Sequence, residues 1–534
     1  MSKPRIVIED VYDEKAKKTY VYETEVYYDP AIKNTRRRRK MLGHRDPETG
    51  ELKPNRPIKN KKKASPQNNS ETILNEAKKI TRRFYGATYF LHGIARKIGL
   101  EKDLAQVFPE DYQSMLQLAY YLVLSPSNAM CHFESWQKKH YLPYNNSETL
   151  TSQRISDIFS RVTEHEKQEF FNLRMKALKP KEYIYYDTTS ISSYSSLLPY
   201  VKYGYNKEDD KLPQINLGVL QGEQCELPVM YRHLAGNVQD SKTIKWLLGM
   251  LDHIECDRIK LVMDRGFYSE ENVYALINDS IGFVMGVRKN LNYIKAAIQE
   301  SKKVISRMSN YSTIYKISGT RIGVDYFKPA NKQSHYPMQA YIYFNTEIAV
   351  EEEKNFNNQI HAIYEKLNKG EVILKELGKT QAKYFTKVET SQGVKFGFNE
   401  EVIEEEKSYF GYFVLLSTFK KDPWEILRLY RSKNMIEETF HNLKERLNMR
   451  RLRVSSERSL EGKLFIQFIA LIIQSYIQRE MDRSRLRENY TQKEILDTFQ
   501  AIEYLSHPTY GTTMGEVSVK QRELFIKMGI TPVG

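Results

Sequence analysis

Apolar residues in the first 178 positions change from a strand-like to a helix-like spacing. Residues 5–28 hold two β-type runs joined by a charged turn, which predicts a pair of strands within an N-terminal segment, residues 1–70. Residues 71–178 carry apolar positions at helical spacing, with Gly and Pro breaks between the runs. This second region is expected to form a domain of short helices.

Residues 179–289 instead predict a mixed α/β unit. The expected order is strand, strand, strand, helix, strand, helix, strand, and the strands are EYIYYD, INLGVLQ, LPVMYRHL, RIKLVMD and GFVMGV. The first strand ends at Asp187, the fourth ends at Asp264, and Asp240 is the expected N-cap of the first helix. Because sites in open α/β sheets gather at the carboxyl edges of strands, Asp187 and Asp264 are candidate functional residues.

The pattern changes twice more toward the C-terminus. Residues 290–408 contain short β-like runs and one helix near Glu351–Leu367, which predicts a mostly β subdomain inserted into the α/β unit. Residues 409–480 return to the α/β pattern, with an apolar strand at 410–417 followed by helices. Residues 481–534 are expected to form a helical C-terminal region.

Trp424–Met449 predicts one long helix, because the run follows a proline, holds no internal Gly or Pro and is rich in strong helix formers. At about 100° per residue, four polar side chains fall within an arc of about 60°. They are Tyr430, Lys433, Glu437 and Lys444, beside an apolar arc of Leu429, Ile436, Phe440, Leu443 and Leu447. Glu438 and Glu445 lie well round the cylinder, so the phase selects Glu437 as the carboxylate that accompanies the cations. Taken alone, a charged amphipathic surface helix explains the same pattern.

Length and charge narrow the function classes. The chain has 534 residues, a length that suggests roughly three or four domains. Its 40% hydrophobic content supports sizeable cores and excludes a disordered chain. The 82 Lys and Arg residues exceed the 67 Asp and Glu residues, which gives a formal net charge of +15. This excess favours a polyanionic partner, nucleic acid before membrane, although a basic surface that serves solubility gives the same net charge.

Cationic residues gather near the N-terminal end of the chain. A run of five precedes a turn-rich connector and four lysines: Arg36, Arg37, Arg38, Arg39 and Lys40, then Lys59, Lys61, Lys62 and Lys63. Like charges this dense repel unless an anion neutralises them, so the segment is either an arm that binds the DNA backbone or a solvated linker. The helices of residues 71–178 are likewise either a helix-turn-helix-like DNA-binding unit or a plain helical bundle.

Cysteine spacing and apolar runs bear on the cellular compartment. The three cysteines show neither CxxC nor Cys/His ligand spacing, so neither a disulfide framework nor a zinc site is expected; they are Cys131, Cys225 and Cys256. The first ten residues lack the apolar run of a signal peptide. The longest apolar stretch, Leu464–Ile477, contains Gln467 and Gln474 and is too short to span a bilayer, so it is expected to be a buried helix. These features fit the reducing cytoplasm.

Three acids far apart in the sequence suit one reaction. Two divalent cations roughly 3.5–4 Å apart, held by shared carboxylates, stabilise the attacking and leaving oxygens of a phosphodiester. Taken singly, Asp187 and Asp264 are more typical of turns, and Glu437 of an exposed helix surface. Their order, the two strand ends and the helix phase together favour a shared metal site.

The same residues carry a resemblance to a known family. The spacing Tyr430-x2-Lys433-x3-Glu437-x6-Lys444 resembles the Tyr-x2-Arg-x3-Glu-x6-Lys signature of a large group of bacterial insertion-sequence transposases with a DDE site. Lys433 stands where the family has Arg, which keeps the charge but loses the bidentate fork for phosphate. The stretches YYDTTSISSYS and LVMDRGFYSEENV are similar to the segments that hold the family's first and second Asp. The resemblance covers residues 180–480 well and the N-terminal region loosely.

The resemblance implies an α/β fold with an RNase H-like mixed-sheet catalytic core that the β insertion interrupts. It implies Mg²⁺-dependent cleavage of transposon-end DNA and strand transfer into target DNA. Asp187, Asp264 and Glu437 would bind two Mg²⁺ ions, with Mn²⁺ as a possible substitute, and act in catalysis. Tyr430, Lys433 and Lys444 would contact phosphates of the transposon end.

The resemblance also implies partners and a route of excision. The partners are double-stranded DNA and a second copy of the chain, as a homodimer on DNA without a membrane, in a bacterial cytoplasm at the nucleoid. Excision through a DNA hairpin, with a flipped base held by an aromatic residue, is the family's route. The sequence does not identify that residue, and core packing is the more ordinary fate of the four weak candidates, Tyr409, Phe410, Tyr412 and Trp424.

Other function classes fit some of these features. An RNase H-like nuclease, such as a resolvase or a repair enzyme, would cut DNA without joining it, and a strand-transfer assay separates the two. A DNA-binding protein that has lost catalysis would keep the basic segments, but the presence of all three acids argues against it. A polybasic membrane-surface protein is disfavoured, because no amphipathic or lipidated anchor adjoins the basic run.

Overall fold

The computed structural model of the chain describes most of its residues. They are 5–29, 34–55, 74–144, 149–179, 182–195, 197–206, 211–251, 259–328, 331–390, 393–452, 454 and 456–534. They fall into two compact units, Met1–Ile80 and Thr81–Gly534. Five residues of the sequence analysis lie outside the described residues: Lys59, Lys61, Lys62, Lys63 and Cys256.

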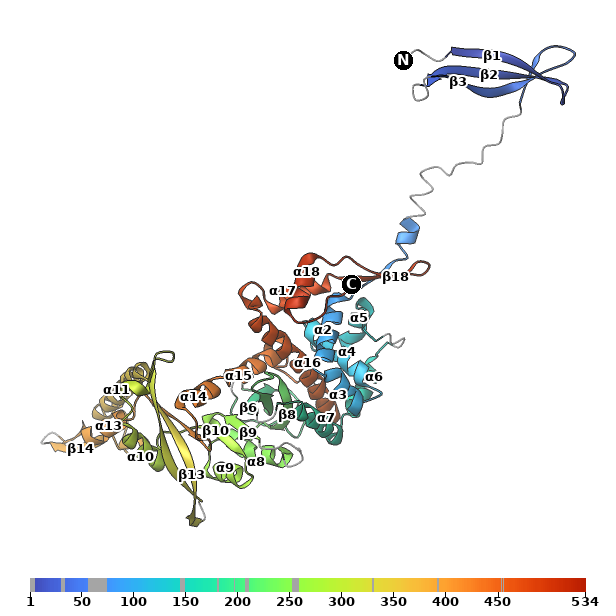
Figure 1. Cartoon of the computed structure of the whole chain (residues 1–534). Helices are drawn as coiled ribbons and strands as arrows, with labels where there is room; N and C mark the ends of the chain where they lie inside the picture. The colour runs from blue at the N-terminus through green and yellow to red at the C-terminus, as the bar shows by residue number, and fades with distance from the viewer. Residues whose placement is uncertain are drawn as a thin grey trace. The chain divides into compact units, whose positions relative to one another are not determined.

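The first unit is a four-stranded antiparallel sheet in the order β1-β2-β3-β4 (Figure 1). The strands are β1 (Arg5–Asp13), β2 (Lys18–Asp29), β3 (Asn34–Arg45) and β4 (Leu52–Pro54). The two strands expected from the alternation are β1 and β2. The basic run Arg36–Lys40 lies in β3, exposed to solvent and paired with Thr24, Tyr27 and their neighbours in β2. It is therefore a strand of a sheet rather than a linker, and its contact with DNA stays a prediction.

Short helices fill most of the region expected to be helical. They are α2 (Gly86–Lys97), α3 (Leu100–Val107), α4 (Tyr112–Leu124), η1 (Met130–His132), α5 (Phe133–Lys139), α6 (Ser152–Ser160) and α7 (Glu164–Lys176). The expectation of helix throughout this region is wrong near its start, where β5 (Thr81–Phe84) forms. β5 pairs with β17 (Glu503–His507), which pairs in turn with β18 (Gly511–Met514). Strand partners more than 400 residues away leave no trace in a local pattern.

The C-terminal region is accordingly not all helical. Its helices are η5 (Leu486–Glu488), α17 (Gln492–Gln500) and α18 (Val519–Lys527). The hairpin of β17 and β18 lies between α17 and α18 in the chain and completes a three-stranded sheet with β5. This small sheet joins the first helices of the second unit to its last ones.

A nine-stranded mixed sheet organises the second unit, in the order β11-β12-β13-β16-β10-β9-β6-β7-β8. The five strands expected from residues 179–289 are β6 (Tyr183–Ser192), β7 (Gln214–Gly222), β8 (Pro228–Ala235), β9 (Lys260–Met263) and β10 (Gly282–Val287). β9 runs parallel to β6 and to β10, whereas β7 is antiparallel to both β6 and β8. The two expected helices are α8 (Asp240–Leu251) and α9 (Glu270–Asn278).

The range expected to form an insertion contributes to this same sheet. β11 (Tyr311–Ser312), β12 (Ile317–Lys328) and β13 (Asn331–Phe344) extend the sheet beyond β16 (Tyr412–Ser417). The rest comprises α10 (Asn292–Ser301), η3 (Met308–Asn310), α11 (Thr346–Asn368), α12 (Lys379–Ala382), α13 (Glu400–Lys407) and a hairpin of β14 (Phe385–Thr390) and β15 (Gly393–Phe398). Residues of α11, α13 and β14 form a small hydrophobic cluster of their own.

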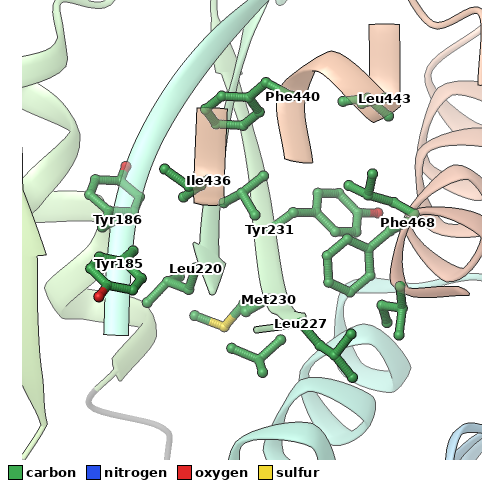
Figure 2. Packing of buried hydrophobic residues seen from close by; sticks show 14 of the residues in the cluster. Tyr185, Tyr186, Leu220, Leu227, Met230, Tyr231, Ile436, Phe440, Leu443 and Phe468 are labelled. Atoms are coloured by element: carbon green, nitrogen blue, oxygen red, sulfur yellow. The ribbon is translucent and has the colours of Figure 1, made fainter. Parts of the chain in front are cut away.

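The apolar stretch Leu464–Ile477 is buried, as expected, within α16 (Glu457–Arg483). This helix is long and apolar enough to cross a membrane, but 94% of its most apolar window is buried inside the fold. Phe468 of α16 packs against Tyr231 of β8, with ring centroids 4.9 Å apart. Figure 2 shows this pair in one cluster with Ile436, which belongs to the segment that carries Glu437.

Candidate active site

The segment expected to be one long helix consists of three helical pieces. They are α14 (Pro423–Arg431), α15 (Asn434–His441) and a π-helix, η4 (Asn442–Arg446). The expectation of a single α-helix is therefore wrong. No Gly or Pro lies at the break after Arg431 or at the change to a π-helix after His441. Leu443, Leu447 and Met449 are all buried. The wider π turn changes the phase of the side chains that follow His441, and these turns are frequent at functional sites.

Four polar side chains of α15 and η4 line one cavity of about 460 Å³: Glu437, His441, Lys444 and Glu445. It is lined by Asp187, Thr188, Thr189, Asp240, Asp264, Gly266, Phe267, Lys433, Glu437, Phe440, His441, Lys444 and Glu445. Glu438 points elsewhere, as its phase predicts, and pairs with Arg487 at 3.4 Å. The expectation for Glu445 is wrong, because Glu445 lies within the π-helix η4 and lines the cavity.

Asp187 lies within β6 rather than at its end, because the strand continues to Ser192. The residues after Asp187 pair with β7, from Asp187 opposite Val219 to Ser192 opposite Gln214. The Asp187 carboxylate accepts a hydrogen bond from the backbone N–H of Thr188 at 2.7 Å. The run TTSIS, which the expected strand end at Asp187 would leave outside the strand, is therefore strand, and Asp187 lines the cavity from within β6.

Asp264 directly follows β9, as expected, and caps the short helix η2 (Arg265–Phe267). Its carboxylate accepts hydrogen bonds from the backbone N–H of Arg265 and from the hydroxyl of Tyr430, each at 2.7 Å. Burial raises the pKa of Asp264, but the two hydrogen bonds and the Lys433 charge outweigh it, so the pKa is lowered. Burial and the Asp264 charge raise the pKa of Tyr430. Tyr430 therefore keeps its proton and donates a hydrogen bond to an ionised Asp264.

Lys433 joins the second acid to the third. Its Nζ lies 3.5 Å from Asp264 Oδ2 and 3.3 Å from Glu437 Oε1, and its side chain is 16% exposed. Burial lowers the pKa of Lys433, but the charges of Asp264 and Glu437 outweigh it, and the pKa is raised. Since both oxygens contact one nitrogen, their separation cannot exceed the sum of these two distances. The carboxylates of Asp264 and Glu437 thus both face the positively charged Lys433 ammonium group.

The donor set of the cavity fits a hard divalent cation. Carboxylate oxygens are the ligands that such cations prefer, and Asp187, Asp264 and Glu437 all line the cavity. Among the described residues, no group of three or more His, Cys, Asp or Glu side chains is gathered closely enough to hold an ion as it stands. The Lys433 ammonium lies between two of the acids instead. A cation bridging Asp264 and Glu437 would therefore require Lys433 to move aside.

Asp240 is a fourth acid that the sequence analysis did not assign to the site. It begins α8, lines the cavity and accepts a 2.5 Å hydrogen bond from the Thr188 hydroxyl. The sequence marked Asp240 only as a helix N-cap. Its place beside Asp187 depends on how α8 packs on the sheet, which spacing does not reveal. His441 and Glu445 were also not assigned to the site.

The residues expected to contact DNA lie in different places. Lys433 and Lys444 line the cavity, whereas the Tyr430 hydroxyl is engaged by Asp264. The basic run Arg36–Lys40 belongs to the first unit. The phosphate contacts of all these residues stay predictions.

The four aromatic candidates for base stacking pack against neighbouring side chains. Tyr409 is buried, with the Lys295 ammonium 4.8 Å from its ring centroid. Trp424 packs against Tyr343, at 6.1 Å between ring centroids. Phe410 and Tyr412 are likewise partly covered by other aromatic rings. Core packing, the more ordinary interpretation, therefore describes this group.

Comparison with known proteins bears on the same region. A family model described as "Transposase DDE domain" matches residues 179–473, more than half of the chain, and that range contains all three acids. Among solved structures, the chain gives a match to a piggyBac transposase in a cryo-EM synaptic complex with hairpin DNA, at 12% identity and a TM-score of 0.34. That alignment covers 76% of this chain and 70% of the other. A search of curated proteins gave no match. By the family match, the chain belongs to the transposase DDE domain family.

Proposed function

We propose that the chain is a transposase that cleaves the DNA ends of a mobile element and transfers them to target DNA. The observation that carries this proposal is the single cavity lined by Asp187, Asp264 and Glu437, within the range matched by the family. The proposal extends to an RNase H-like core made by β6 to β10. The strand order β8-β7-β6-β9-β10, with β9 and β10 parallel to β6, supports it.

The residues have distinct roles in the proposed reaction. Asp187, Asp264 and Glu437 would hold two Mg²⁺ ions, or Mn²⁺, which when bound activate water and stabilise the attacking and leaving oxygens. Tyr430 orients Asp264 by its hydrogen bond. Lys433, displaced from between the acids, and Lys444 would hold phosphate oxygens and offset their charge without transferring protons.

Successive in-line displacements make up the proposed reaction. Water first attacks the phosphorus at the element end, and the bond to the 3′ oxygen breaks to leave a 3′ hydroxyl. That hydroxyl then attacks a phosphorus of the opposite strand, which closes a hairpin on the element end and releases the 3′ oxygen of the flanking DNA. A second water opens the hairpin and frees the 3′ hydroxyl again, which then attacks a phosphorus of the target and releases a target 3′ oxygen. Two ends must be held together, so we propose a homodimer on DNA, in a bacterial cytoplasm at the nucleoid.

Single substitutions test the carboxylate assignment. Asp187→Ala, Asp264→Ala and Glu437→Ala are each expected to abolish Mg²⁺-dependent cleavage of DNA that carries the element end. Glu438→Ala is the matched control on the same helix, because Glu438 points away to Arg487 and its loss should be mild. Near-normal cleavage by any one of the three variants would overturn the assignment. Cleavage without joining in a strand-transfer assay would identify a nuclease instead.

A further inference from the structure

The segment between β6 and β7 exposes a group of large side chains that the proposed reaction does not use. We call it the tyrosine loop and define it by Tyr194, Tyr203 and Tyr205, each at least 74% exposed. Leu197, of the same segment, is also exposed. Large apolar side chains concentrated on one surface segment mark a contact with a partner.

The backbone of the tyrosine loop is anchored to the sheet. Lys202 exchanges two backbone hydrogen bonds with Gln214 of β7, each 2.9 Å long. The Gln214 side-chain amide also donates to the Tyr205 carbonyl at 2.9 Å. Gly204 touches the backbone of Gly236 so closely that a Cβ on Gly204 would lie 2.0 Å from the Gly236 carbonyl oxygen. Tyr203 and Tyr205 therefore project from an anchored stretch of backbone, which lowers the entropic cost of binding to their rings.

Cationic groups connect the tyrosine loop with the carboxylate cavity. The Arg451 guanidinium lies over the Tyr194 ring, 5.3 Å from its centroid. Arg450 Nε donates to Glu445 at 2.8 Å, and Glu445 lines the cavity. The backbone N–H of Ser192, at the end of β6, donates to the Arg450 carbonyl at 3.3 Å. Arg450 and Arg451, adjacent in the chain, thus link Glu445 of the cavity to Tyr194 of the tyrosine loop.

Exposed rings beside cations suit unpaired nucleotides. Bases stack on aromatic faces, and ammonium or guanidinium groups contact the phosphates between them. An intact duplex offers base edges in its grooves and keeps the base faces stacked inside. Single-stranded DNA, rather than duplex, therefore matches what the loop presents.

We infer that the tyrosine loop is a binding surface for single-stranded DNA, on which bases stack against Tyr203 and Tyr205 while Lys202 contacts the backbone. The inference rests on the proposed function for the origin of the strand, a DNA end opened next to the carboxylate cavity. The inference adds a second part of the substrate, the unpaired nucleotides beyond the cleaved bond. The tyrosine loop would bind these nucleotides, and the three acids would not.

A binding experiment without cleavage tests this inference. The full-length protein is titrated, in EDTA, into a fluorescein-labelled 12-nucleotide oligo(dT) and, separately, into a labelled duplex of equal length. The double variant Tyr203→Ala/Tyr205→Ala is expected to bind the single strand at least tenfold more weakly and the duplex within twofold of the parent chain. The double variant with Phe at both positions keeps the rings and should bind both DNAs like the parent.

A spectroscopic signal and a control position sharpen the result. An oligonucleotide with 2-aminopurine should lose fluorescence when its base stacks on the parent protein or on the Phe variant, and keep it with the Ala variant. Tyr510→Ala is the matched control, since Tyr510 is equally exposed on the hairpin of β17 and β18. Equal losses for both DNAs, no loss, or the same loss from Tyr510→Ala would each overturn the inference. Because EDTA prevents cleavage, a failed carboxylate assignment would leave this assay unchanged, and the reverse also holds.

Discussion

The Tyr430 hydroxyl donates a 2.7 Å hydrogen bond to Asp264, so a side chain of α14 orients the carboxylate that follows β9. Tyr430→Phe removes this donor and little else. A hydrogen bond to a charged group contributes about 1.5–3 kcal/mol, so single-turnover cleavage is expected to fall roughly tenfold or more. Cleavage rates measured over a range of Mg²⁺ concentrations check this, and an unchanged rate would assign Tyr430 a packing role only.

Gly286 of β10 leaves room for that hydroxyl. A Cβ at this position would lie 2.7 Å from the Tyr430 oxygen and 3.2 Å from the Arg265 nitrogen. Gly286→Ala is expected to displace Tyr430 and reduce cleavage at least as much as Tyr430→Phe, with a stability loss of about 1–3 kcal/mol. Gly323→Ala in β12 is the control, because a Cβ there meets nothing within 4 Å. Urea unfolding and cleavage assays on both variants separate the two positions.

Asp240 adds negative charge to the cavity wall and accepts a hydrogen bond from the Thr188 hydroxyl. Asp240→Asn keeps an acceptor for Thr188 but removes the charge. We expect the Mg²⁺ concentration for half-maximal cleavage to rise several-fold, with a nearly normal rate at saturating Mg²⁺. Titration of cleavage with Mg²⁺ measures both quantities. A rate that stays near zero at saturation would instead make Asp240 a direct participant in the reaction.

The arginine-rich strand β3 leads to a prediction about how DNA binding depends on salt concentration. Replacing Arg36, Arg37 and Arg38 with Ala is expected to weaken duplex DNA binding and to reduce the slope of log K against log salt by roughly 2–3, since each lost phosphate contact removes about 0.9. Arg39→Ala should have a smaller effect, because Arg39 pairs with Glu9 at 2.9 Å. Anisotropy titrations at several salt concentrations give the slopes. Identical slopes for the triple variant and the parent would exclude β3 from the DNA contact.

His140 predicts a loss of stability in acid. Burial lowers the pKa of His140 from 6.5 to about 4. The unfolded chain takes up a proton at His140 below about pH 6.5, whereas the folded chain does so only near pH 4. The free energy of unfolding therefore falls as the pH drops through this window, by about 3 kcal/mol from His140 alone. His140→Gln should flatten the fall. Urea unfolding at pH 7 and pH 4.5, monitored by tryptophan fluorescence, measures this fall in the free energy of unfolding. Trp136 is a probe close to the site, because its ring stacks on that of His140.

Local patterns predicted the parts of the fold that depend on local contacts. The strands β6 to β10 were found because their buried faces are runs of apolar residues; every residue of β7, for example, is buried. Lys433 and Glu437 were placed together correctly because they face each other across one turn at the start of α15. Asp264 was found at a strand end because the turn DRG follows a short apolar strand.

Contacts between segments distant in the sequence determine the parts of the fold and of the candidate site that local patterns did not predict. β5 is a strand because β17 pairs with it, and β13 belongs to the central sheet because β16 pairs with it. The π turn at Asn442–Arg446 brings Glu445 to the cavity without any helix-breaking residue to announce it. Asp240 reaches the cavity through the Thr188 contact, which links residues 52 positions apart. None of these arrangements has a signature within a window of one helix or strand.

The position of β16 limits which residues could be deleted to shorten the chain. β16 is hydrogen-bonded to β10 on one side and to β13 on the other, and it directly precedes α14. A shortened version that lacked residues 290–408 would leave β16 with a bare flank, and exposed strand edges recruit other chains into aggregates. Trimming from the hairpin of β14 and β15 inward, with β13 retained, is the safer direction for engineering a compact version of the chain.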